Sequence, residues 1–139
     1  MFGNARVYGF MKKKKDALYV VLCVIAVVTV VSGAVQAYVP AFVLGFIGGD
    51  PTPGNLLSFG IVGMFMVLFG GMLLHALINR RHHPVVVLWA GLQKFGASGA
   101  VGLGVMRGLF SSLALGVALF DLLSGCLILW YWLAIRRIR

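Results

Sequence analysis

The residues with the clearest chemical potential are Lys94 and Asp121, a cation and an anion that both lie in the middle of long apolar segments. Each is the eleventh residue of a segment long enough to span a bilayer. At about 1.5 Å per helical residue, each lies roughly 15 Å from a membrane face, near the midplane. An unpaired charge there costs about 2.5–3.5 kcal/mol on insertion scales. We therefore expect the two side chains to face each other on consecutive antiparallel helices.

Small residues accompany both charges at helical spacing, which predicts that the two helices approach closely. The stripes consist of Gly91, Lys94 and Ser98 on one segment and Ala114, Ala118, Asp121 and Gly125 on the next. Two interpretations remain open: an ion pair that fixes helix pairing, or a proton relay, ion site or polar substrate anchor. The structural interpretation is favoured, because a single pair without further acids or histidines makes a poor proton wire.

The elements that carry these residues are membrane helices. Hydrophobic residues make up 61% of the 139 residues and charged residues only 11%, with a mean hydropathy of +1.02. A chain this small cannot bury that much apolar surface in its own core, so lipid must solvate much of it. The predicted fold is an all-α, integral membrane four-helix bundle in one membrane domain, residues 1–139. The expected spans are residues 17–39, 55–78, 84–106 and 111–135.

Turn residues separate these spans. Residues 48–54 form a Gly- and Pro-rich turn cluster, and residues 79–83 form a polar loop that precedes a proline suited to a helix start. Pro40 is expected to end or kink the first helix. Residues 41–47 are apolar but too short to span, which predicts an interfacial or partly re-entrant segment.

Basic residues predict the orientation. Of the 12 Lys and Arg residues, all but Lys94 and Arg107 lie on one side of a four-span arrangement. The positive-inside rule then places both termini in the cytoplasm of a multi-pass bacterial inner (plasma) membrane protein. The chain has a net charge of +9, but its basic residues cluster between apolar segments. This clustering argues against a nucleic acid as the partner of the protein. In an alternative interpretation, residues 11–37 form a cleaved signal peptide, although the apolar stretch is longer than usual.

Other polar residues give weaker signals. Gln93 lies beside Lys94, Gln36 near the outer end of the first span and His75 about one turn from the inner end of the second. We predict no metal site, because His82 and His83 are consecutive and lack acidic or thiolate neighbours. Further small residues predict close helix packing within the bundle or against a partner, namely Gly60, Gly63, Gly70 and Gly71 in the second span and Gly96, Ala100, Gly104 and Gly108 in the third.

The order of these motifs resembles the small four-helix bacterial inner-membrane proteins grouped as DoxX-like. Similar features are Ser32-Gly33 followed by Tyr38-Val39-Pro40, a Gly-rich span over residues 60–71, the segment 89–94 (WAGLQK), and an aspartate in the last span. The resemblance implies a four-helix bundle. It also implies a relation to subunits of membrane redox complexes that communicate with quinone, without assigning a catalytic residue.

Three functions are compatible with these residues. The first is a non-catalytic accessory subunit or helix bundle that contacts lipid or quinone, with Lys94 and Asp121 joining two helices. Gln93, Ser98, His75, Gly91 and Gly125 are its expected pocket or interface residues. The alternative is a transporter or channel for a small solute or protons that uses the charged pair, and the third is an intramembrane enzyme with Asp121 or His75 as acid or base. Expected partners are the lipid bilayer and a larger membrane redox complex or a second copy. No cofactor is predicted beyond quinone or lipid contact.

Overall fold

The computed structural model describes residues 3–79 and 83–136, with side chains from Asp16 onward, and these residues form an all-α bundle. Its helices are α1 (Gly3–Tyr38), α2 (Pro40–Phe46), α3 (Pro53–Ile78), α4 (Pro84–Met106) and α5 (Ala114–Arg136). All but α2 are long and apolar enough to cross a membrane. The chain is therefore a small polytopic membrane protein, in agreement with the fold predicted from composition.

Local sequence explains where the helices begin and end. Pro40 separates α1 from α2, and the side chain of Thr52 caps α3 by accepting a hydrogen bond from the Asn55 backbone N–H at 3.3 Å. Gly48 and Gly108 end α2 and α4 with φ values of 73° and 71°. In this left-handed conformation the following N–H groups bond back to the last helical carbonyls, which satisfies groups that a helix end would otherwise leave free.

The last helix begins three residues later than predicted from sequence. The expected span starts at Ser111, whereas α5 starts at Ala114. The backbone N–H of Ser111 donates a hydrogen bond to the carbonyl of Ile47 at 2.8 Å. This bond attaches the turn between α4 and α5 to the end of α2, a tertiary contact that sequence periodicity does not reveal.

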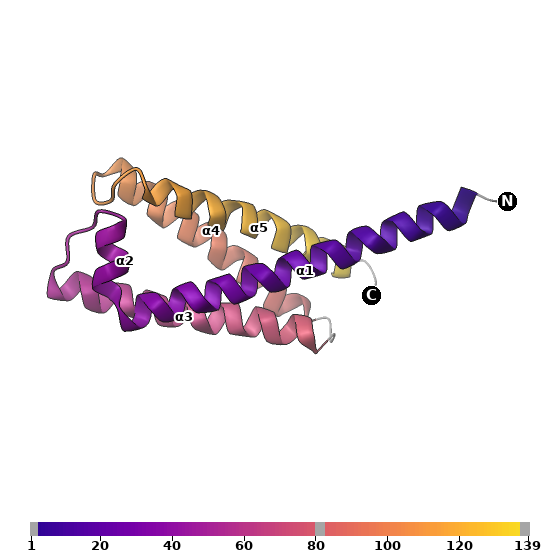
Figure 1. Cartoon of the computed structure of the whole chain (residues 1–139), viewed down its shortest axis with the longest axis horizontal. Coiled ribbons are helices and arrows are strands. Elements are labelled where there is room, and N and C mark those ends of the chain that lie inside the picture. Colours follow the sequence, from indigo (N-terminus) through magenta and orange to yellow (C-terminus); the bar gives the residue numbers. More distant parts are fainter. Residues whose placement is uncertain (1–2, 80–82, 137–139) are drawn as a thin grey trace.

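The long helices form two antiparallel pairs, α1 with α3 and α4 with α5 (Figure 1). Glycines set the spacing of the first pair. A Cβ atom on Gly63 would lie 2.6 Å from the backbone nitrogen of Ala37, and one on Gly33 would lie 2.7 Å from the carbonyl oxygen of Gly63. Real Cβ atoms do not approach other atoms so closely, so only glycine permits this helix contact. The contact at Gly70 is less tight, because a Cβ atom there would lie 3.1 Å from the carbonyl oxygen of Ala26, and Gly71 faces open space.

The two pairs meet at one end of the bundle and diverge at the other (Figure 1). We call the end where they meet the terminal end, because α5 ends there and α1 projects beyond the bundle. We call the end where they diverge the α2 end. An apolar cluster joins both pairs toward the terminal end, with Leu22, Leu77, Val87 and Ile128 among its buried members. A smaller cluster of Leu44, Ile47 and Ala114 joins α2 to the start of α5. The space between the pairs thus lies between two apolar clusters.

Candidate functional site

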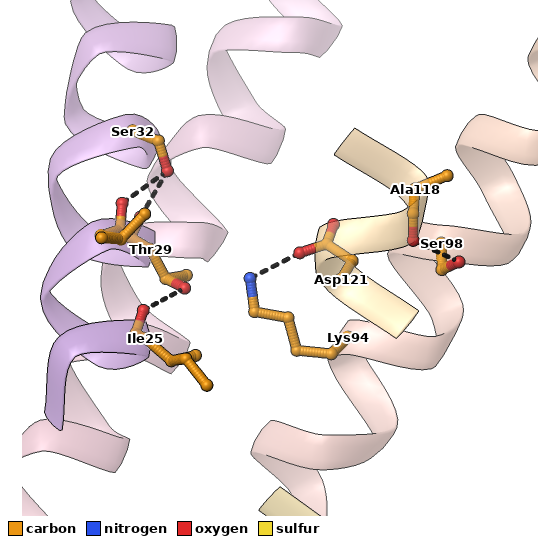
Figure 2. A network of polar contacts seen from close by, with 8 residues as sticks. Ile25, Thr29, Ser32, Lys94, Ser98, Ala118 and Asp121 are labelled. Atoms are coloured by element: carbon orange, nitrogen blue, oxygen red, sulfur yellow. Dashed lines mark hydrogen bonds and ion pairs between the residues drawn. The ribbon is translucent and has the colours of Figure 1, made fainter. Parts of the chain in front are cut away.

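The candidate site is built around the ion pair between Lys94 on α4 and Asp121 on α5. Lys94 Nζ lies 2.6 Å from Asp121 Oδ1, and the two side chains are only 4% and 7% exposed (Figure 2). The ammonium also lies 5.2 Å from the centroid of the Phe120 ring, within cation–π range. The two charges that sequence spacing predicts to face each other therefore do so. A charge-assisted hydrogen bond offsets part of the cost of removing them from water.

The small-residue stripes lie in the interface between α4 and α5. Ser98 Oγ donates a hydrogen bond to the carbonyl of Ala118 at 2.8 Å, one helical turn from the ion pair (Figure 2). A Cβ atom on Gly91 would lie 2.7 Å from the side chain of Leu129, and one on Gly125 would lie 2.9 Å from the Phe95 ring. Ser98, Gly91 and Gly125 thus hold the two helices together and are not among the residues that line the cavity described next.

A cavity of about 560 Å³ separates the two helix pairs on the α2 side of the ion pair. Its walls are mainly apolar, and its polar lining residues are Gln36, Gln93, Arg107 and Asp121. Gln93 and Arg107 are 14 residues apart on α4 and its C-cap, which corresponds to about 21 Å along the helix. Val62 and Leu103 line the cavity and are still 50% and 51% exposed, so it is open to its surroundings.

Several polar atoms of the lining have no partner within the described chain. Asp121 bonds Lys94 through Oδ1, which leaves Oδ2 without a hydrogen bond. Gln36 Nε2 donates to the carbonyl of Phe59 at 2.9 Å, which leaves Oε1 free although the residue is only 7% exposed. The Gln93 amide and the Arg107 guanidinium also make no hydrogen bond or ion pair to a described residue. Among the described residues, Ser111 Oγ is the only fully buried side-chain N or O atom without a partner. The free polar atoms of the lining are therefore accessible from the cavity and can form hydrogen bonds to a ligand.

Other residues singled out from the sequence lie elsewhere. His75 sits toward the terminal end of α3, where its Nε2 lies 2.9 Å from Asn79 Nδ2. It lines a shallow groove with His83, and His82 lies outside the described residues. Within residues 3–79 and 83–136 no group of three or more His, Cys, Asp or Glu side chains is placed to hold a metal ion.

The predicted small-residue face on α4 does not contact another long helix in the described structure. Gly96 has no atom near the position of a Cβ, and Gly104 packs against the Phe110 ring from the turn before α5. Ala100 lines the cavity, and Gly108 lies in the turn. Sequence reasoning therefore identified Gln93 as a pocket residue but missed Phe110, because no local pattern indicates that this turn folds back onto α4.

Comparisons with models of known protein families, with curated protein sequences and with solved structures find no match to this chain.

Proposed function

We propose that this protein is a non-catalytic membrane helix bundle that binds a membrane-dissolved amphipathic molecule, a lipid or a quinone, in the cavity above the Lys94–Asp121 pair. The observation that carries the proposal is the cavity itself, mainly apolar and about 560 Å³ in volume. Small-molecule sites in proteins have volumes of about 300–1,000 Å³ and combine apolar walls with a few polar groups that orient the ligand.

The position of the cavity favours a ligand that enters from the bilayer. Val62 on α3 and Leu103 on α4 are half exposed where they line it, and both are side chains that lipid solvates well. The ion pair at its floor carries no net charge, so an uncharged polar group can approach Asp121 and Gln93 without a large electrostatic cost. The same arrangement suits an accessory subunit of a larger membrane redox complex, as the resemblance to DoxX-like proteins implies.

The proposal is tested by native mass spectrometry of the full chain purified in a mild detergent. We expect wild-type protein to retain a small molecule of defined mass. The variant Ala97→Trp fills the cavity and should lose it, because Ala97 lines the wall. The matched control is Leu92→Trp on the same helix, whose side chain is exposed and lies outside the cavity lining. Equal retention by both variants, or no retained molecule in the wild type, would contradict the proposal.

A transporter or channel for a small solute or protons is the second candidate. It is supported by Asp121, whose carboxylate reaches both the ion pair and the cavity. On the other side of the pair, the two helix pairs are joined by apolar side chains that include the fully buried Leu22 and Ile128. Transport would therefore require the apolar cluster to open. Proton or solute flux into liposomes that is abolished by Asp121→Asn, and unaffected by Leu92→Trp, would favour this candidate over binding alone.

A further inference from the structure

We infer that the buried end of the ligand in this cavity is a hydrogen-bond donor, so that the site selects hydroxyl-bearing amphipaths over matched ketones and ethers. The inference rests on the proposed function and adds the chemical class of the ligand. Its basis is the kind of polar atom that remains free at the two most buried polar positions of the lining, Asp121 and Gln36.

Both of these positions present acceptors. Lys94 uses Asp121 Oδ1, and Oδ2 is a carboxylate oxygen that can only accept while the group is ionised in its ion pair. The Phe59 carbonyl is an acceptor, so it must receive the NH₂ group of Gln36, and the free atom of that amide is therefore Oε1. The residues are only 5% and 7% exposed, but neither free oxygen is fully buried, so both can be reached from the cavity.

A ligand that carries only acceptors cannot satisfy these atoms. A carbonyl or ether oxygen near Oδ2 would add repulsion between lone pairs and would still displace any water there. A hydroxyl group donates to Oδ2, and its own oxygen can accept from the amide of Gln93, which has no partner in the described chain. One neutral hydroxyl therefore satisfies Asp121 Oδ2 and the Gln93 amide, and Gln36 Oε1 remains available to a second donor. The apolar walls between Gln93 and Arg107 accommodate a hydrocarbon chain.

Lys94 does not reverse this preference. Its ammonium is the nearest donor, but it is bonded to Oδ1, packs over the Phe120 ring and is absent from the cavity lining. Arg107 is a donor at the far end of the cavity, where it can contact a second polar group of a longer ligand without affecting the choice at the deep end.

Direct binding of two probes tests the inference. The full chain with Met106→Trp as reporter, in lipid nanodiscs, is titrated with terminally brominated decanol and with its methyl ketone analogue. Met106 is exposed and lies outside the cavity lining, next to the lining residue Arg107, so the reporter does not fill the site. Bromine quenches a nearby indole, and expressing each concentration as a mole fraction of the bilayer removes differences in partitioning. The parent chain, in which Met106 is retained, gives the background quenching from its own tryptophans. We expect the alcohol to bind about tenfold or more tightly than the ketone, the size of one hydrogen bond to a charged group.

A second variant tests the role of Oδ2. In Asp121→Asn the amide oxygen should turn to the Lys94 ammonium, so that the NH₂ group replaces Oδ2 in the cavity and the preference for the alcohol is lost or reversed. The wild-type comparison stands on its own if this variant does not fold. Equal affinity for alcohol and ketone would overturn the inference and leave the proposed function intact. Saturable quenching by neither probe would overturn both.

Discussion

Lys94 Nζ and Asp121 Oδ1 lie 2.6 Å apart although their residues are 27 positions apart in the chain, and almost no solvent reaches either side chain. The contact joins α4 to α5 (Figure 2), between the apolar cluster that joins the two helix pairs and the cavity. The pair therefore has two structural consequences. It links α4 to α5 through buried charges, and it places a carboxylate oxygen at the floor of the cavity.

Breaking this pair should destabilise the protein strongly. We expect Lys94→Met or Asp121→Leu to lower the free energy of unfolding by about 3–5 kcal/mol, because each leaves one buried charge uncompensated. The measurement is the yield of monodisperse protein together with the midpoint of thermal unfolding in detergent. The double variant Lys94→Asp with Asp121→Lys should recover much of the loss. A swap that is no more stable than either single reversal would contradict direct pairing.

The contact between α1 and α3 should depend on Gly63. Replacing it by alanine places a methyl group against the backbone of Ala37 and Gly33, so the two helices must separate. We expect Gly63→Ala to lower the thermal midpoint clearly. The matched control is Gly71→Ala, where a methyl group meets nothing within 4 Å and helix propensity should add about 0.5–1 kcal/mol. If both alanine variants behave alike, the close approach of α1 and α3 is wrong.

The hydrogen bond from Ser98 to the Ala118 carbonyl should contribute modestly to stability. Interhelical hydrogen bonds in membrane proteins contribute about 0.6 kcal/mol on average. We expect Ser98→Ala to cost about that amount in reversible unfolding, far less than loss of the ion pair one turn away. Ser58→Ala, in the exposed first half of α3, is the control for loss of a hydroxyl group. A cost of several kcal/mol for Ser98→Ala would instead indicate a role for this hydroxyl beyond one interhelical bond.

The sequence was sufficient to predict those features that follow from the free-energy cost of a single residue in its local environment. Burying Lys94 or Asp121 alone is expensive, so equal depth on neighbouring spans was enough to predict their contact. Pro40 likewise ends a helix, and the glycines of residues 48–54 favour a turn, because of the backbone geometry of these residue types. The cavity could not be predicted in this way. It depends on how far the helix pairs diverge, and this is set by long-range contacts such as that between Ser111 and Ile47.

The orientation in the membrane remains a prediction from the positions of Lys and Arg. It is tested in a chain that lacks both native cysteines, through Cys23→Ser and Cys126→Ser. In intact cells, a membrane-impermeant maleimide should label Asp50→Cys in the turn before α3, and it should label Asn79→Cys, at the end of α3, only after permeabilisation. Labelling of the second variant from outside would reverse the topology and place the cavity in the cytoplasmic half of the membrane.

The most direct test of the binding proposal is an experimental structure of the wild-type chain grown from a lipidic mesophase. We predict elongated density in the cavity between Gln93 and Arg107, with a polar atom within hydrogen-bonding distance of Asp121 Oδ2. The structure of Ala97→Trp should lack this density while the ion pair is retained. A wild-type structure in which α3 and α4 close over the cavity, or in which only water occupies it, would contradict the account.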